Sequence, residues 1–108
     1  MREPNLIELS VHEIENTAGT QVRKTLDKRI IKDYSEWYQS GALFPPLIVF
    51  AEGGGQRYIL ADGFHRLEAA KLAGLETIAC DLRSGGMRDA LEFALGANYD
   101  HGDRKSVV

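Results

Sequence analysis

The sequence predicts an α+β fold, with a small, partly antiparallel sheet and packed helices, and three observations predict it. Apolar runs at 47–50 and 58–60 flank a glycine-rich turn, which is typical of a β-hairpin. Stretches with apolar residues three and four positions apart lie before and after this hairpin and indicate amphipathic helices. Strands and helices follow each other in a mixed order, which favours an α+β arrangement with a small mixed sheet.

The first third of the chain predicts one strand and one helix. A short strand is expected at 6–9, followed by a loop over 10–24. A helix is expected over Leu26–Ser40, with Asp27 in its first turn and Gly41 just past its end. Its tyrosine and tryptophan side chains fall on the apolar stripe, so we expect them to pack in the core.

The hairpin and the elements after it follow from stronger local signals. Pro45-Pro46 excludes a helix and leads into the strand at 47–50, which returns at 58–60 after the turn. The remaining expected elements are a helix, a strand and a second helix, at Phe64–Ala73 (followed by Gly74), Leu75–Leu82 and Met87–Ala97.

The composition fits one cytoplasmic domain. A chain of 108 residues with 44% apolar residues is long enough for a single core. The net charge of −3 argues against a broad electrostatic clamp on nucleic acid, but it leaves room for a small basic patch. No apolar run reaches the roughly 20 residues of a membrane span, and the N-terminus does not resemble a signal peptide. The single cysteine, Cys80, lies in an apolar run and is expected to be an inert core thiol.

The densest chemistry lies at the junction between the hairpin and the second helix. A glycine turn at a helix start presents free N–H groups and the positive end of the helix dipole, which together favour phosphate. Gly63 has no Cβ, so a phosphate can approach the backbone. Arg66 offers a planar fork of donors, and His65 can donate a hydrogen bond or exchange a proton near neutral pH. We therefore expect a phosphate site here.

The same residues also allow a purely structural interpretation. Asp62 is expected to cap the helix, and Phe64 is expected to turn inward as its anchor. Arg66 would then pair on the surface with Asp62 or Glu68. From chemistry alone, a phosphate site and an ordinary capped turn both remain open.

Other candidate sites are weaker. The histidines His12, His65 and His101 match no metal-binding spacing, so no metal site is expected from them. The glycines at 53–55 join two strands and do not open a helix, so they are not a P-loop. The turn at 84–86 opens the last helix, and it either faces the same ligand or is a capped turn.

At these residues the chain resembles the ParB/sulfiredoxin superfamily. The segment 60–70 is similar to the phosphate motif of ParB-type domains, usually Gly-Glu-Arg-Arg, and to the Gly-Cys-His-Arg motif of sulfiredoxin. The stretch 21–24 resembles the Gln-Pro-Arg box, 46–49 the Pro-Ile-Val-Val strand, and 94–98 the last ParB motif. The segment 101–105 resembles the His-Gly-x-Arg-Arg of ParB-like proteins from phages and mobile elements.

The resemblance implies a single ParB-like domain over 1–108, with 99–108 as the entry to a DNA-binding region beyond it. It implies a nucleoside triphosphate as cofactor, since partition proteins use CTP and sulfiredoxins use ATP, with Mg²⁺ as a possible companion. Gly63, His65 and Arg66 match the phosphate motif, Arg23 would reach in from the first box, and Asn98 matches the asparagine near the phosphates. The expected partners are the nucleotide, DNA through the later segment, and a second copy of the chain, with no membrane.

Two residues differ from the motifs of the superfamily, and each weakens one of the functions that the resemblance implies. Phe64 stands where sulfiredoxin has its catalytic cysteine, which argues against reduction of sulfinic acids. Ala97 stands where a glutamate is usual, which weakens a magnesium site. An enzyme of this fold, nuclease-like or a small-molecule kinase, is an alternative, with Asp62, Glu68 or His65 as its base. A scaffold that has lost the ligand is a second alternative, and a salt bridge closing 61–66 would favour it.

Overall fold

The computed structural model describes residues 4–16 and 26–96 of the chain. Two of the expected site residues, Arg23 and Asn98, lie outside these ranges, as does the expected entry segment 99–108.

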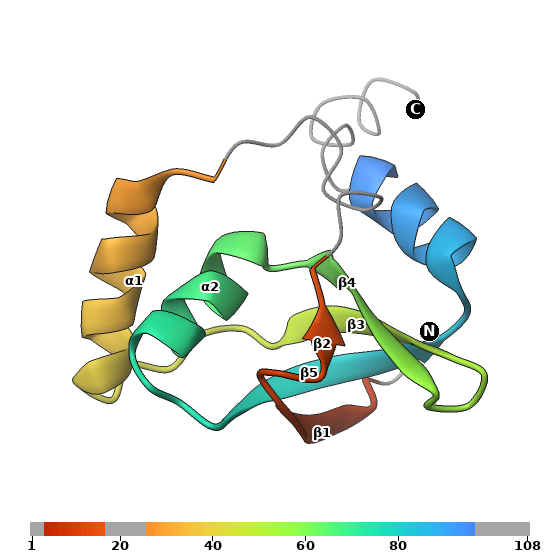
Figure 1. The fold of residues 1–108 in the computed structure, drawn as a ribbon, viewed down its shortest axis with the longest axis horizontal. Helices are drawn as coiled ribbons and strands as arrows, with labels where there is room; N and C mark the ends of the chain where they lie inside the picture. The colour runs from red at the N-terminus through yellow and green to blue at the C-terminus, as the bar shows by residue number, and fades with distance from the viewer. Residues whose placement is uncertain (1–3, 17–25, 97–108) are drawn as a thin grey trace.

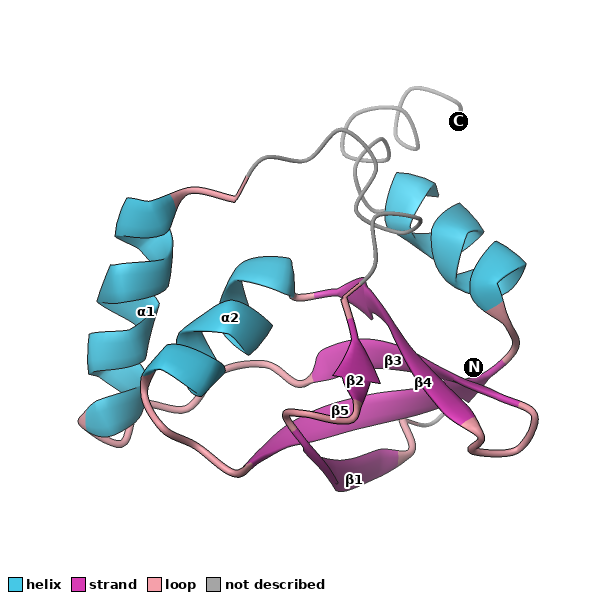
Figure 2. Ribbon diagram, viewed as in Figure 1, coloured by secondary structure: helices cyan, strands magenta, loops and turns pink. Residues whose placement is uncertain are grey.

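The described residues form a five-stranded mixed sheet in the order β1-β5-β3-β4-β2 (Figures 1 and 2). The pairs β1–β5 and β3–β4 are antiparallel, whereas β3–β5 and β2–β4 are parallel. The strands are β1 Leu6–Ser10, β2 Ile14–Glu15, β3 Leu47–Glu52, β4 Arg57–Asp62 and β5 Thr77–Ser84. The helices are α1 Lys28–Gln39, α2 Phe64–Leu72 and a further helix over 87–96. The expected α+β fold with a mixed sheet is confirmed.

The sheet carries a separate hydrophobic cluster on each face. One face packs against α2, and its fully buried residues include Leu47, Leu60 and Leu67. The other face packs Phe50 and Ile59 against Ala90 of the helix over 87–96. Figure 1 shows α1 and α2 together on one side and the last helix on the other. Helix α2 and the helix over 87–96 therefore pack against opposite faces of the sheet.

The β3–β4 hairpin leads into the glycine turn at Gly63. It is longer than the apolar runs alone indicate, because β4 continues to Asp62, which pairs with Ile48. The register shifts between Ile48 and Val49, so β4 carries one extra residue there. Such a bulge increases the local twist of a strand. It lies where β4 leaves the sheet and the chain turns into α2.

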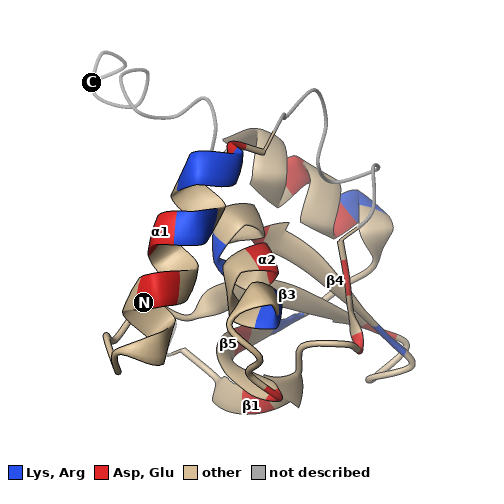
Figure 3. Ribbon diagram, turned by 60° about the vertical axis from the view of Figure 1, so that its left-hand side comes forward, with Lys and Arg blue, Asp and Glu red and all other residues tan. Residues whose placement is uncertain are grey.

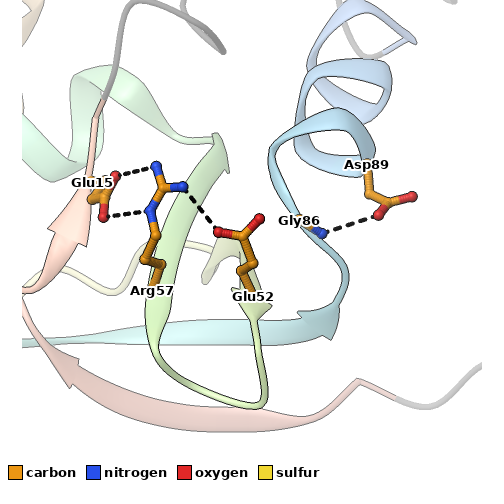
Figure 4. A network of polar contacts seen from close by, with 5 residues as sticks. All are labelled: Glu15, Glu52, Arg57, Gly86 and Asp89. Atoms are coloured by element: carbon orange, nitrogen blue, oxygen red, sulfur yellow. Dashed lines mark hydrogen bonds and ion pairs between the residues drawn. The ribbon is translucent and has the colours of Figure 1, made fainter.

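A cluster of ion pairs holds β2 against the sheet, and the sequence predicted no strand at this place. The loop expected over 10–24 contains this two-residue strand, so that expectation is wrong at Ile14–Glu15. Arg57 on β4 donates to both carboxylate oxygens of Glu15, at 2.8 and 3.0 Å, and to Glu52 on β3 at 2.9 Å (Figure 4). The hydrogen bonds from Arg57 lower the pKa of Glu15. One guanidinium thus ties three strands together at this edge of the sheet.

Helix α1 differs from expectation at its start and along its aromatic stripe. Asp27 is the N-cap rather than a first-turn acid, and its carboxylate accepts the Arg29 N–H at 2.9 Å. Gly41, with φ of 89°, ends the helix as expected. Trp37 is 52% exposed, so the expectation that it packs in the core is wrong. It belongs to a surface aromatic group with Tyr34 and Phe44, and this group lies beside the core rather than in it.

Candidate functional site: the glycine turn at the start of α2

Gly63 is the N-cap of α2 and adopts a left-handed conformation, with φ of 101°. A Cβ at this position would lie closer than 3.0 Å to Leu47 Cδ2, so only glycine fits without a shift. Asp62 makes no capping hydrogen bond, and the expectation that it caps α2 is therefore wrong. The physical reason is that Asp62 still belongs to β4, and the cap position falls one residue later. Gly63 has no side chain, so the N-cap residue itself offers no side-chain acceptor to the start of α2.

Arg66 is held by the backbone ahead of β3. Its Nη1 donates to the carbonyl oxygens of Pro45 and Pro46, the latter at 3.2 Å. Its Nη2 lies 3.6 Å from the Asp62 carboxylate, in an ion pair without a hydrogen bond. The Arg66 side chain is only 16% exposed, whereas that of Asp62 is 46% exposed. The guanidinium therefore has a fixed position, and one of its edges is directed at an acid that water can reach.

His65 joins the starts of the two helices. Its Nε2 accepts a hydrogen bond at 3.0 Å from the backbone N–H of Asp27, the N-cap of α1. A ring nitrogen that accepts a hydrogen bond carries no proton, so the imidazole is neutral in this arrangement. His65 lies in the first turn of α2, so this bond connects the first turn of α2 to the N-cap of α1.

A small hollow opens at the turn, with a volume of about 160 Å³. Its lining consists of Tyr34, Asp62, Gly63, Phe64, His65 and Arg66. Four predicted site residues thus meet in one place: Asp62, Gly63, His65 and Arg66. Tyr34 was missed, because no motif marks it. Its place on the apolar stripe of α1, three residues before Trp37, was the available signal, but only the packing of α1 on α2 brings it to the turn.

The other candidates lie elsewhere or play structural parts. Glu68 accepts from Asn16 Nδ2 at 3.0 Å and pairs with Lys71 at 3.7 Å, and it does not line the hollow. The turn at 84–86 lies before the last helix, on the opposite face of the sheet, and its Gly86 N–H donates to Asp89 at 3.0 Å (Figure 4). It is therefore a capped turn.

The described residues offer little for binding a metal ion at the turn, and the single thiol of the chain is buried elsewhere. Within 4–16 and 26–96, no three His, Cys, Asp or Glu side chains are grouped to hold a metal ion. The hollow offers one carboxylate, Asp62, which suits Mg²⁺ only together with phosphate oxygens. Phe64 is buried, as expected, at 5% exposure. Cys80 is fully buried in β5, and burial raises the pKa of its thiol to about 12, so it is the inert core thiol that was expected.

The fold and the turn define the class of protein as a ParB/sulfiredoxin-like domain. The family model of the ParB N-terminal domain matches residues 1–99, and the chain belongs to this family. A chromosome-partitioning protein, Spo0J of Thermus thermophilus, is 32% identical over 87 residues, which are 81% of this chain and 32% of that protein. The chain thus spans about a third of the length of this relative.

Solved structures agree with this fold. The chromosome-partitioning protein ParB of Caulobacter crescentus, complexed with CTP-gamma-S, superimposes with a TM-score of 0.74 at 23% identity, over 92% of this chain and 55% of that one. Sulfiredoxin of Arabidopsis thaliana superimposes with a TM-score of 0.67 at 28% identity, over 85% of this chain and 98% of that one. In the part of the chain that the structure describes, no helix has the length and apolar character that crossing a bilayer requires.

Proposed function

We propose that this chain is the nucleotide-binding module of a ParB-type partition or transcription-regulating protein, of the phage or mobile-element kind. It binds a nucleoside triphosphate, CTP or ATP, at the turn Asp62–Arg66. The observation that carries the proposal is the start of α2 behind Gly63, an N-cap without a side chain, in the same hollow as His65 and Arg66. The N-terminal end of a helix beside a fixed guanidinium favours the binding of a phosphate group.

The hollow suits phosphates rather than a whole nucleotide. Its volume of about 160 Å³ leaves room for part of a triphosphate, with the sugar and base outside it. Arg66 can keep its Nη1 bonds to the two proline carbonyls while its Nη2 exchanges Asp62 for a phosphate oxygen. The ion pair between Arg66 and Asp62 has no hydrogen bond, whereas a phosphate oxygen carries more charge and can accept one. Exchanging Asp62 for phosphate is therefore favourable for Arg66.

Asp62 makes the binding depend on a cation. A carboxylate beside a triphosphate repels it unless a counter-ion lies between them. Mg²⁺ is commonly held by one or two carboxylates and the phosphates of the substrate, which is what Asp62 and a triphosphate would offer. We therefore expect Mg²⁺ to strengthen binding, and Asp62→Asn to remove most of the dependence on Mg²⁺.

The likeness to ParB N-terminal domains also supports a wider role. In this proposal, residues 1–108 form one domain that adjoins a DNA-binding region entered at 99–108, and nucleotide binding changes how that region docks. A ligand can drive such a change only by binding one arrangement better than the other. A homodimer of the whole protein is part of this proposal.

The test is isothermal titration of the chain with CTP, ATP and GTP, each with and without Mg²⁺. We expect heat with at least one nucleotide, and a loss of affinity of about tenfold or more in Arg66→Ala, because a charge-assisted hydrogen bond contributes about 1.5–3 kcal/mol. Arg66 also supports the backbone, so His65→Ala is the second variant and thermal melting checks the fold of both. Arg88→Ala is the matched control, because Arg88 is exposed on the last helix.

The pair between Arg66 and Asp62 favours one alternative, a scaffold domain that binds no ligand. In that case the pair closes the turn permanently. Folded protein that gives no heat with any of the three nucleotides would establish the scaffold and refute the proposed function. Release of inorganic phosphate that Asp62→Asn abolishes would instead point to the enzyme alternative, since Asp62 is the one acid among the residues that line the hollow.

A further inference from the structure

The charges on α1 run in the order opposite to the one that stabilises a helix. Its first turn contains Lys28 and Arg29 and no acid, and Lys32 follows one turn later. Asp33 and Glu36 come after them, and the last turn contains no base. Figure 3 shows this as blue at the start of α1 and red farther along. A helix start is the positive end of its dipole, where acids are favourable and bases are not.

The bases of the first turn are unfavourable there, although the Asp27 carboxylate at the N-cap offsets part of this effect. A charge of the wrong sign in a terminal turn costs typically about 0.3–1 kcal/mol. Neither Lys28 nor Arg29 takes part in an ion pair within 4–16 and 26–96. Lys32 lies 4.0 Å from Glu36, but both side chains are well exposed, and such pairs contribute little. Lys28, Arg29 and Lys32 are all exposed, and we call these three residues the α1 basic strip.

The strip lies near the glycine turn. The hydrogen bond from Asp27 to His65 places the start of α1 beside the start of α2, and both helices begin at the same end of the molecule (Figure 1). The starts of the two helices, the strip and Arg66 therefore lie near one another, with Asp27 and Asp62 as the acids between them. Lys28 and Lys32 are four residues apart, about 6 Å along the helix axis, so they form a row rather than a point.

We propose that Lys28, Arg29 and Lys32 contact the phosphate backbone of DNA, as a second contact besides the region that follows 99–108. A row of exposed cations fits a repeating polyanion, whereas a free nucleotide fills only the hollow. Contacts of this kind carry no sequence information, but they position a protein on the duplex. The strip is the kind of small basic patch that a net charge of −3 still allows. Binding of DNA to the strip would not require a nucleotide.

The test is the binding of the chain to a fluorescent duplex of random sequence, measured by anisotropy without nucleotide from 25 to 150 mM salt. Three neutralised phosphates predict a slope of log K against log salt of about −2.7. In the triple variant K28Q/R29Q/K32Q we expect the slope to approach zero and the affinity at 50 mM salt to fall at least tenfold. Its melting temperature should stay equal or rise, because the unfavourable charges are gone and glutamine is as good a helix former as lysine.

Two controls separate the strip from net charge. The variant K28R/R29K/K32R keeps the charge and should keep the slope. Arg88→Gln removes an exposed base from the last helix and should leave affinity within about twofold. The proposal is overturned if the wild-type chain does not bind DNA at 25 mM salt, or if the triple variant binds as the wild type does. Equal binding to a glutamate-rich peptide of the same charge would overturn it in favour of an acidic protein partner.

Discussion

Gly63→Ala tests whether the site depends on a backbone that only glycine can adopt. The left-handed conformation at φ of 101° costs an alanine about 1–2 kcal/mol. The new Cβ would also meet the Cδ2 of Leu47, which is fully buried, and overpacking of this kind costs about 1–3 kcal/mol. The sum is about 2–5 kcal/mol, a large part of the total of roughly 5–15 kcal/mol expected for a small domain.

Thermal melting followed by circular dichroism measures this loss. At about 4 °C for each kcal/mol, Gly63→Ala should lower the melting temperature by roughly 8–20 °C. Gly74→Ala is the matched control, because Gly74 also has a positive φ, of 85°, but a Cβ there would meet nothing within 4 Å. It should therefore show the backbone cost alone, about 1–2 kcal/mol.

A double variant isolates the contact with Leu47. Leu47→Val removes the Cδ2 atom and should cost about 1 kcal/mol by itself. Combined with Gly63→Ala, it should cost at least about 1 kcal/mol less than the sum of the two single changes, because the collision is relieved. Equal losses in Gly63→Ala and Gly74→Ala, or strict additivity in the double variant, would refute the close approach of Gly63 to Leu47.

Two further predictions concern titratable groups. Cys80 should react with a thiol reagent at pH 8 at least about a hundredfold more slowly in the native protein than in urea, because burial raises its pKa to about 12; rapid native labelling would contradict the buried position. The raised pKa also means that its contribution to stability is complete below the unfolded thiol pKa of about 8.5 and is lost as the pH rises from there toward 12. Because Arg57 lowers the pKa of Glu15, the Glu15 contribution is present above the unfolded pKa of about 4.3 and is lost as the pH falls below it. Glu15→Gln should therefore flatten the fall in melting temperature between pH 5 and 3, and an unchanged profile would show that the pair on this exposed edge contributes nothing.

The parts of the fold that the sequence predicted are those that local signals determine. Pro46 before an apolar run, the glycines of the hairpin turn and Gly41 after α1 each act on neighbouring residues, and the structure confirms all three elements. Strand β2 was missed because its two residues are a strand only through their pairing with β4, more than 40 positions away. Trp37 was misplaced because spacing shows which residues share a face of a helix but not what covers that face.

In the candidate site too, the residues marked by local patterns were predicted and those that depend on tertiary packing were not. Gly63, His65 and Arg66 were recognised, since a glycine turn at a helix start is a local pattern. The assignment of Asp62 as the cap failed by one residue, because the pairing of Asp62 with Ile48 keeps it in the sheet. Tyr34 and the bond between Asp27 and His65 depend on how α1 packs on α2, and a single sequence contains no signal for that packing.

The two bonds from Arg66 to the carbonyls of Pro45 and Pro46 have a consequence for interpreting related sequences. They give this arginine a structural task that persists whether or not a phosphate is present. A relative that has lost its ligand would therefore still be expected to keep the arginine, because replacing it would leave two carbonyls without donors. Arginine at this position is thus a poor indicator of ligand binding.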